Sequence, residues 1–521
     1  MEKSSPLLSE TNSTDDGSTL SLDPISQLSS LDDMVEQSLG GFGCSQLIQV
    51  LLVSLLLIFD AQQTFLSVYT DAEPTWHCTN SSTCNSSSNI CNLSKSSWAW
   101  DGPSHKTIIS AWSLECASSI LIGLPSSCFL VGCLLGGFVL STHGDSSLGR
   151  KKLLLLSCFA MSITAFTTIF STDIWIYSSF RFVCGCFRAS IVTTTLVLLM
   201  EKVGKRWRGQ AGIIGFFSFS LGTLTLPALA YINRNSSWKT LYVWTSVPGI
   251  LYCIAVFPFL SESPRWLLIH GYKAEALAVL RKLASSSSSV NFDSLNLSLS
   301  NIPLQEEVQK FHLYSFMKEM FNRKWALRRL LLAMGAAFGI GLAYYGLLLG
   351  VGNLDSNIYL SLTFNALLEI PAYFLSFFVI EKWKRTSSML AFCIVSGICS
   401  IICGIIGNGQ KVLQFGPELA SFFTVCVAFN VLLIYVTELF PTSVRNSSAS
   451  MVRQAVSFGA AFSPMLISAG RQNGLVSFGA FGLFVLCSGG FLACLPETKG
   501  VPLCETLDEQ ERLDGNSVHV T

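Results

Sequence analysis

Twelve long apolar segments recur along the 521-residue chain, and they decide what it can fold into. Each holds roughly 20 residues with few charges, about what an α-helix needs to cross ~30 Å of hydrocarbon. Backbone groups in lipid must bond within their own segment, so the sequence predicts an all-α membrane protein. We place the segments at residues 46–68, 118–141, 153–170, 174–199, 211–232, 240–260, 327–349, 357–380, 389–408, 413–436, 449–469 and 475–495.

Composition supports this assignment and excludes several classes of protein. Half of the residues are hydrophobic and only 13% are charged, whereas a soluble protein has about a quarter charged. A net charge of zero gives no reason to expect nucleic acid as a partner. The sequence has no His/Cys cluster with zinc spacing, no phosphate-binding Walker A loop and no set of nucleophile, base and orienting residue. We therefore expect no metal, no cofactor and no enzymatic activity.

Charged residues that follow apolar segments in the first half have counterparts in the second half, in the same order. The counterparts are separated by 235 to 237 residues. The pairs are Asp145 with Glu381, Glu201 with Glu438, Arg208 with Arg445, and Glu262 with Glu497. A duplicated six-helix unit is the plan of a secondary transporter whose substrate lies between the halves. The expected fold is twelve transmembrane helices in two pseudo-symmetric six-helix bundles.

The same features divide the chain into five parts. Residues 1–45 are rich in Ser and Asp, have no apolar signal-peptide core, and are predicted to be a disordered tail. The first bundle occupies 46–260 and the second 327–495, joined by a loop at 261–326 and followed by a tail at 496–521. Within the joining loop, Lys273–Leu283 has the pattern of an amphipathic helix.

Basic residues set the expected orientation. Arg150, Lys151 and Lys152 lie on one side of the predicted topology, together with the bases that follow Glu201 and Glu381, while loops on the opposite side carry few. Short cytosolic loops are enriched in Lys and Arg, so both termini are predicted to be cytosolic.

The long loop at 69–117 is then predicted to face away from the cytosol. It carries four cysteines, which in an oxidising compartment suggest two disulfides whose pairing the sequence leaves open. It also carries three glycosylation sequons. The cysteines are Cys78, Cys84, Cys91 and Cys116, and the sequons begin at Asn80, Asn85 and Asn92.

Four short motifs at the segment ends resemble a known family. They are Leu148–Lys151, Glu262–Leu267, Thr437–Thr442 with Arg445 after it, and Pro496–Gly500. Together they are similar to the major facilitator superfamily, in its sugar-porter and organic-ion branches. The large cysteine-bearing first loop resembles the organic cation/carnitine transporters, especially their plant members. The chain departs from the pattern at Ser146, where a basic residue is usual, and at 381–385, a degraded second copy of the loop motif.

The charged segment ends are predicted to form a cytosolic gate. Ion pairs there would hold helix ends together and favour the outward-facing state, at about 1 kcal/mol for each exposed pair. The alternative is that these residues only set topology and cap helices. The gate set is Asp145, Arg150, Glu201, Arg208, Glu262, Arg265, Glu381, Glu438, Arg445 and Glu497.

Ionisable residues inside apolar segments point to the transported species, because such residues usually face a cavity or a partner. Asp60 lies in the first segment and Arg181 at the start of the fourth. Their arrangement resembles proton-coupled sugar porters, and we predict that Asp60 binds a coupling proton whose affinity Arg181 tunes. A static buried ion pair is the alternative.

Glu369 and Arg453 are predicted to contact the substrate. A carboxylate in the eighth segment resembles the acid that lines the organic cation transporters' cavity, and Tyr344 matches an aromatic of that pocket. Arg453 lies one turn before Ser457, the position at which relatives differ in charge. One negative and one positive group suit a zwitterion such as carnitine. Alternatively, Arg453 pairs internally with Glu369 or Glu438.

These observations predict a carrier of organic cations or zwitterions, carnitine first, with a proton as coupling ion and membrane lipid around it. A sugar or organic anion carrier of the same fold, or a receptor that does not transport, are the rivals. We expect a monomer, and we favour the vacuolar membrane over the plasma membrane.

Overall fold

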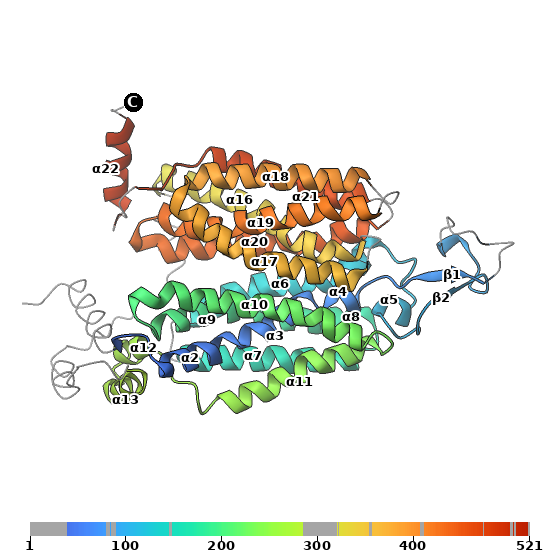
Figure 1. Cartoon of the computed structure of the whole chain (residues 1–521), viewed down its shortest axis with the longest axis horizontal. Coiled ribbons are helices and arrows are strands. Elements are labelled where there is room, and N and C mark those ends of the chain that lie inside the picture. Colours follow the sequence, from blue (N-terminus) through green and yellow to red (C-terminus); the bar gives the residue numbers. More distant parts are fainter. Residues whose placement is uncertain are drawn as a thin grey trace, which may run out of the picture.

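The computed structural model places two helical bundles one against the other (Figure 1). It describes residues 39–79, 84, 90–144, 148–284, 320, 322–353, 357–406, 411–471, 474–500, 504 and 507–518. The described chain is almost entirely helical, as the apolar segments predict. A two-stranded hairpin extends from one end of the bundles, which we call the hairpin end, and helices α12 and α13 mark the opposite, linker end.

The first bundle contains six membrane-length helical stretches. The first is continuous over α2, α3 and α4, and the fourth over α8 and α9. Their bounds are α2 Cys44–Ser54, α3 Leu56–Phe65, α4 Ser67–Thr70, α6 Ser119–Gly144, α7 Arg150–Thr167, α8 Ile174–Arg188, α9 Ile191–Glu201, α10 Arg208–Ile232 and α11 Trp238–Val256.

The second bundle repeats this plan with six unbroken helices. These are α16 Lys324–Gly350, α17 Ile358–Lys382, α18 Arg385–Ile406, α19 Lys411–Leu439, α20 Thr442–Ala469 and α21 Gly474–Ala493. The bundles meet where α6 packs on α20 and where α10 packs on α17. A site between the halves is therefore built from these four helices and from the α3 and α16 faces beside them.

Eleven of the described helical stretches are apolar enough to cross a membrane, and each matches a predicted segment. The exception is α20, which begins at Thr442 rather than at the predicted residue 449. Its first turns are polar, Thr442–Ser450, so hydropathy placed the start too late. Polar residues on a membrane helix must face protein or a cavity, and α20 indeed packs on both α16 and α6.

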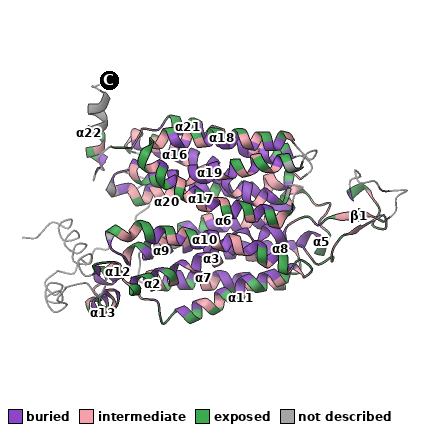
Figure 2. Cartoon of the chain, viewed as in Figure 1, coloured by how far each residue is buried: buried purple, intermediate pink, exposed green. Residues whose placement is uncertain are grey.

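Apolar side chains cover the outer surface of the bundles, as lipid exposure requires. Phe374, Ile405 and Leu156 are 64%, 68% and 55% exposed. Figure 2 shows exposed residues on the outward helix faces and buried residues between the helices.

Glycines allow the helices of the first bundle to touch at backbone distance. A methyl group on Gly132 of α6 would lie 2.1 Å from the carbonyl oxygen of Phe182 on α8, and one on Gly136 would lie 2.3 Å from the Cys186 oxygen. Close approach through small residues is a typical way for membrane helices to pack without a hydrophobic driving force. Gly123 uses the same device across the two halves, because a methyl there would lie 2.8 Å from the Pro464 oxygen of α20.

The segment after the first helix folds into a small outer structure. Strands β1 (Trp76–Cys78) and β2 (Trp98–Trp100) pair antiparallel, followed by the short helix α5 (Ile108–Ala111). Disulfides join Cys78 to Cys84 and Cys91 to Cys116, which settles the pairing that the sequence left open. Asn92 lies in a short 3₁₀ turn, Ile90–Asn92, while Asn80 and Asn85 lie outside the described residues.

Two helices at the linker end form a small hydrophobic cluster separate from the core of the bundles. Helices α12 (Pro264–Ile269) and α13 (Lys273–Leu283) pack through Trp266, Leu277 and Leu280. The predicted amphipathic helix is confirmed with the same bounds. Helix α22 (Leu507–Val518) lies at this end too, and Arg323, just before α16, pairs with its Asp508 and Glu511.

Candidate functional site

Glu369 lies in the middle of α17 and is only 1% exposed. Its Oε2 accepts a hydrogen bond from Ser220 Oγ at 2.8 Å, and its Oε1 accepts one from the Tyr344 hydroxyl. Ser220 belongs to α10 of the first half and Tyr344 to α16 of the second. The carboxylate therefore sits between the halves, facing protein and not lipid.

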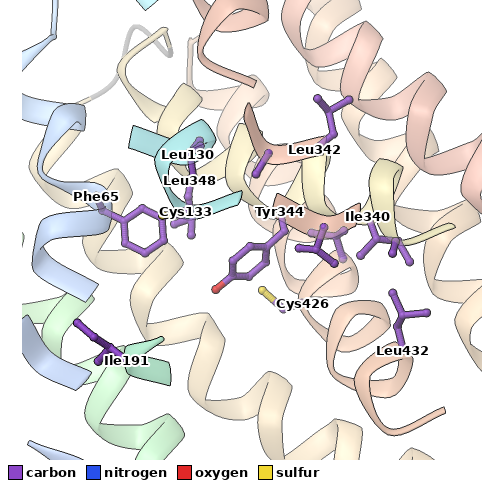
Figure 3. Packing of buried hydrophobic residues seen from close by; sticks show 14 of the residues in the cluster. Phe65, Leu130, Cys133, Ile191, Ile340, Leu342, Tyr344, Leu348, Cys426 and Leu432 are labelled. Carbon is purple, nitrogen blue, oxygen red and sulfur yellow. The ribbon is translucent and has the colours of Figure 1, made fainter. Parts of the chain in front are cut away.

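An aromatic cluster surrounds this carboxylate. The Tyr344 ring stacks on Phe429 at 5.0 Å between centroids and on Phe422 at 5.8 Å. Tyr345 contacts Tyr344 edge to face and stacks on Phe65 of the first half. Figure 3 shows Tyr344 among the buried side chains, with Cys426 next to its hydroxyl end. Such ring faces beside a carboxylate can hold an organic cation.

Arg453 on α20 is half-buried and interacts electrostatically with Tyr345; no hydrogen bond or ion pair of its guanidinium is found among the residues that the structure describes. Glu369 has other partners, and Glu438 pairs with Arg385, so neither internal partner considered from the sequence takes up Arg453. Ser457 lies one turn on and donates to the Arg453 carbonyl oxygen at 3.4 Å.

Asp60 is fully buried on α3 and pairs with Arg188, not with Arg181. The Arg188 Nε and Nη2 atoms lie 3.1 Å from Asp60 Oδ1 and Oδ2, a two-pronged ion pair. The predicted partner was wrong by two helical turns of α8, since Arg188 follows Arg181 by seven residues. A charge in an apolar segment gives depth only roughly, and two arginines seven residues apart share one helix face.

Arg181 is also buried, at 1% exposure, but it contacts residues other than Asp60. Its Nη1 donates to the carbonyl oxygen of Gln63 at 3.2 Å, and its guanidinium lies 4.2 Å from the Phe129 ring centroid. Asp71, at the hairpin end, is the acidic residue with which it interacts electrostatically. The Asp71 carboxylate accepts hydrogen bonds from Tyr177 and Ser126.

Two members of the predicted gate set cap helices. Glu262 Oε1 accepts from the Lys151 amide at 2.8 Å at the start of α7. Glu497 Oε1 accepts from the Arg385 amide at 2.8 Å at the start of α18. Carboxylates at helix N-termini satisfy free amides and favour the helix dipole. The Glu262 and Glu497 pair of the sequence repeat is thus a repeated cap.

Burial alone would raise the pKa of Glu497, but its hydrogen bonds reverse that effect. The Thr386 hydroxyl and the amides of Arg385, Lys499 and Thr386 hold the pKa of this carboxyl below its ordinary value. The ionised carboxylate of Glu497 is therefore the form that caps α18 at the linker end.

A second repeated contact lies beside the caps, within each half rather than between the halves. Arg385 donates from Nε and Nη2 to Glu438, each at 3.1 Å, and in the first half Glu201 interacts with Arg150 and Arg265. Arg208 begins α10, Arg445 donates to the Phe440 carbonyl, and Glu381 is exposed. Asp145 lies outside the described residues.

At the hairpin end the halves are joined by Arg471. Its Nη1 lies 3.5 Å from Glu73 Oε2, and its Nη2 donates to the Asp71 carbonyl at 3.3 Å. Tyr69 of the first half stacks on Tyr359 of the second at 5.5 Å. A cavity of about 1060 Å³ opens beside these rings under the β-hairpin, and neither Glu369 nor Arg453 lines it.

Four buried charges among the described residues were given no role in the sequence analysis, and Asp71 is one of them. Arg188 was given no role, and Glu418 of α19 was not singled out although it interrupts an apolar segment. Lys202 looked like one of several loop bases, yet it is fully buried and donates to Gln49 Oε1 at 2.6 Å and to the Ser261 carbonyl at 2.7 Å. Burial among these neutral acceptors lowers the pKa of Lys202 to about 7.

Known proteins share this architecture. The E. coli xylose transporter XylE in an inward-open conformation superimposes with a TM-score of 0.64 at 16% identity, covering 89% of this chain and 98% of that one. The proton:xylose symporter XylE bound to 6-bromo-6-deoxy-D-glucose gives 0.57 at 17% identity, covering 90% and 98%. These similarities confirm the predicted fold.

Sequence comparison resolves the family. The sugar (and other) transporter family matches residues 65–509. Organic cation/carnitine transporter 2 of Arabidopsis thaliana is 47% identical and transporter 3 is 48% identical; the alignments cover 99% and 97% of this chain and 98% and 97% of the relatives. Solute carrier family 22 member 3 of Mus musculus is 28% identical over 80% of this chain and 74% of its own. The chain therefore belongs to the organic cation/carnitine transporters of the major facilitator superfamily, a family of multi-pass membrane carriers and not of enzymes.

Proposed function

We propose that the chain carries organic cations or zwitterions, carnitine first, across a membrane by alternating access. The observation that carries this proposal is the buried Glu369 carboxylate, which lies between the halves beside Tyr344. Tyr345 contacts the Tyr344 ring and interacts electrostatically with Arg453 of α20. The relatives are named for the same solutes.

The ammonium group of the substrate would replace the two neutral hydroxyl donors of Glu369. Ser220 and Tyr344 now satisfy Glu369, and a cation that enters from between the halves offers the carboxylate a charge that those hydroxyls lack. Cation–π attraction to Tyr344 or Tyr345 adds ~0.5–2 kcal/mol when the site is dry. A carboxylate at the other end of the substrate would accept two hydrogen bonds from the guanidinium of Arg453, with Ser457 beside it.

Asp60 is the proposed site of the coupling proton. Protonation would neutralise Asp60 and release Arg188, which also interacts with Tyr345 of the second half. One proton would thus change a contact between the halves. Arg181, in this proposal, donates to the Gln63 carbonyl three residues after Asp60 and influences the proton site through the backbone of α3.

The linker end is the proposed cytosolic gate, with both termini on that side. Its caps and ion pairs would keep each half rigid while the halves rock against each other. The β-hairpin, its disulfides and its sequons then face the lumen or the cell exterior. We favour the vacuolar membrane and a monomeric carrier.

Proteoliposomes with an imposed pH gradient test the function. Labelled carnitine should accumulate, and unlabelled choline and carnitine should compete, whereas glucose and an aromatic carboxylate should not. Competition by glucose alone would mean a sugar carrier, and competition by the carboxylate alone an anion carrier. Binding without any flux would mean a receptor.

A further inference from the structure

Glu418 is a second fully buried carboxyl, on the second half of the chain. It lies on α19, 0% exposed. Its Oε1 accepts one hydrogen bond, from Asn365 Nδ2 on α17 at 3.1 Å. Its Oε2 is buried and has no hydrogen-bond donor among the residues that the structure describes.

No cation lies near this carboxyl in the described structure. The titratable groups that face it are the thiols of Cys403 on α18 and Cys426 on α19. The Gln414 amide, which could donate, is taken by the Cys403 carbonyl, and Tyr344 of α16 is taken by Glu369. Asp60 differs, since Arg188 neutralises it at 3.1 Å.

An unpaired carboxylate in such surroundings is costly, because an isolated buried charge without a partner loses its hydration and gains nothing in return. A proton removes the charge and gives the second oxygen an O–H group. Glu418 is therefore suited to hold a proton in this conformation, whereas Asp60 is suited to remain charged.

The position of Glu418 links it to the substrate site. Its partner Asn365 lies four residues before Glu369 on α17, so both side chains share one helix face. Glu418 also lies 237 residues after Arg181, the same offset that separates Glu201 from Glu438. The fourth helix of each half thus carries a buried ionisable residue at an equivalent depth.

We propose that Glu418 is a proton-binding residue of the transport cycle, coupled through Asn365 and α17 to the cation site at Glu369. This proposal rests on the proposed function. Glu418 lies seven residues, about 10 Å of helix rise, after the start of α19 at the hairpin end. A proton that enters from this end binds the carboxylate and stabilises the conformation described here. Loss of that proton favours a conformation in which water or another donor reaches Oε2, so proton occupancy biases the exchange between conformations.

The first test is spectroscopic and independent of transport. Infrared spectra of the purified protein in nanodiscs at neutral pH should show the carbonyl stretch of an un-ionised carboxyl. Glu418→Gln should remove that band, while Glu275→Gln, which deletes an exposed carboxylate on α13, should leave it. A wild-type spectrum without the band, or a band unchanged in E418Q, would overturn the proposal.

The second test measures coupling. In proteoliposomes E418Q should keep carnitine exchange at equal pH but lose accumulation driven by a pH gradient, and E275Q should keep both. Full pH-driven accumulation by E418Q would refute the role of Glu418 while leaving the proposed function intact. Absence of any carnitine or choline flux in the wild type would refute the proposed function instead. Should E418Q fail to fold, Asn365→Leu, which removes the single donor, should still weaken coupling without affecting exchange.

Discussion

Glu369 of the second half accepts a hydrogen bond of 2.8 Å from Ser220 of the first half, deep between the two bundles. This hydrogen bond joins the two halves, and the Ser220 hydroxyl occupies the place on Glu369 that a bound cation would take. Any movement that separates α10 from α17 at this depth breaks it and exposes the carboxylate. Opening and substrate access are thereby joined at one residue.

Glu369→Gln should weaken cation binding because it keeps the shape and removes the charge. A hydrogen bond to a charged group is worth ~1.5–3 kcal/mol, so we expect affinity for choline and carnitine to fall roughly 10- to 100-fold. Equilibrium binding to purified protein measures this. Ser220→Ala keeps the charge and should cost much less, so equal losses in both variants would contradict a direct role for the carboxylate.

Arg453→Gln should separate zwitterions from simple cations. The guanidinium has no described hydrogen bond or ion pair to lose, only an electrostatic interaction with Tyr345, so the variant should fold normally. We expect carnitine affinity to fall roughly 10-fold or more while choline affinity stays unchanged, because only carnitine has a carboxylate that can accept two hydrogen bonds from the guanidinium. Arg453→Lys should recover part of the loss. Parallel losses for both solutes would show that Arg453 acts on the fold and not on the substrate.

A double-mutant cycle tests the ion pair that the structure assigns to Asp60. Arg188→Gln leaves a buried carboxylate without its partner, which typically costs ~3–5 kcal/mol. Adding Asp60→Asn should restore most of the stability, measured as the thermal unfolding temperature in detergent. Arg181→Gln is the matched control, and D60N should not rescue it. Rescue of R181Q instead would reinstate the partner first predicted.

Asp60→Asn alone should uncouple transport from protons. The variant cannot take up or release a proton at this site, so accumulation driven by a pH gradient should be lost while exchange continues. Flux assays in proteoliposomes with and without a gradient give the two numbers separately. If D60N accumulates carnitine as the wild type does, the coupling proton binds elsewhere.

The sequence predicted the spans, the repeat and the buried acid at residue 369 because length, apolarity and charge act locally. It could not predict which arginine meets Asp60, since Arg181 and Arg188 share one face of α8 and differ only in depth, which the packing of the helices decides. The start of α20 was missed for a related reason: residues 442–450 are polar, and hydropathy cannot tell a helix face that packs on protein from a loop. Glu418 was overlooked because a lone acid near a segment end looks like a boundary.

The cap at Glu497 should make the linker end sensitive to acid. Its folded pKa lies below the ordinary value of ~4.3, so the cap stabilises the fold above that pH and is lost as pH falls through the lowered pKa. Glu497→Gln should cost about 1 kcal/mol at pH 7, the usual worth of a cap, and should unfold with a flatter dependence on pH below ~4.3. Unfolding temperatures across that range check both expectations. An unchanged acid profile would show that the charge of Glu497 is not what caps α18.

Arg471→Gln should loosen the hairpin end. The variant removes contacts to Glu73 and to the Asp71 carbonyl that join the two halves, while the stack of Tyr69 on Tyr359 remains. A partly exposed ion pair is worth up to about 1 kcal/mol, so we expect roughly a five-fold shift toward conformations open at this end. Hydrogen–deuterium exchange should rise in peptides from 118–126 and 462–470. Arg323→Gln breaks a comparable pair at the opposite end and should leave those peptides unchanged; if both variants raise exchange equally, Arg471 does not act as a local closure.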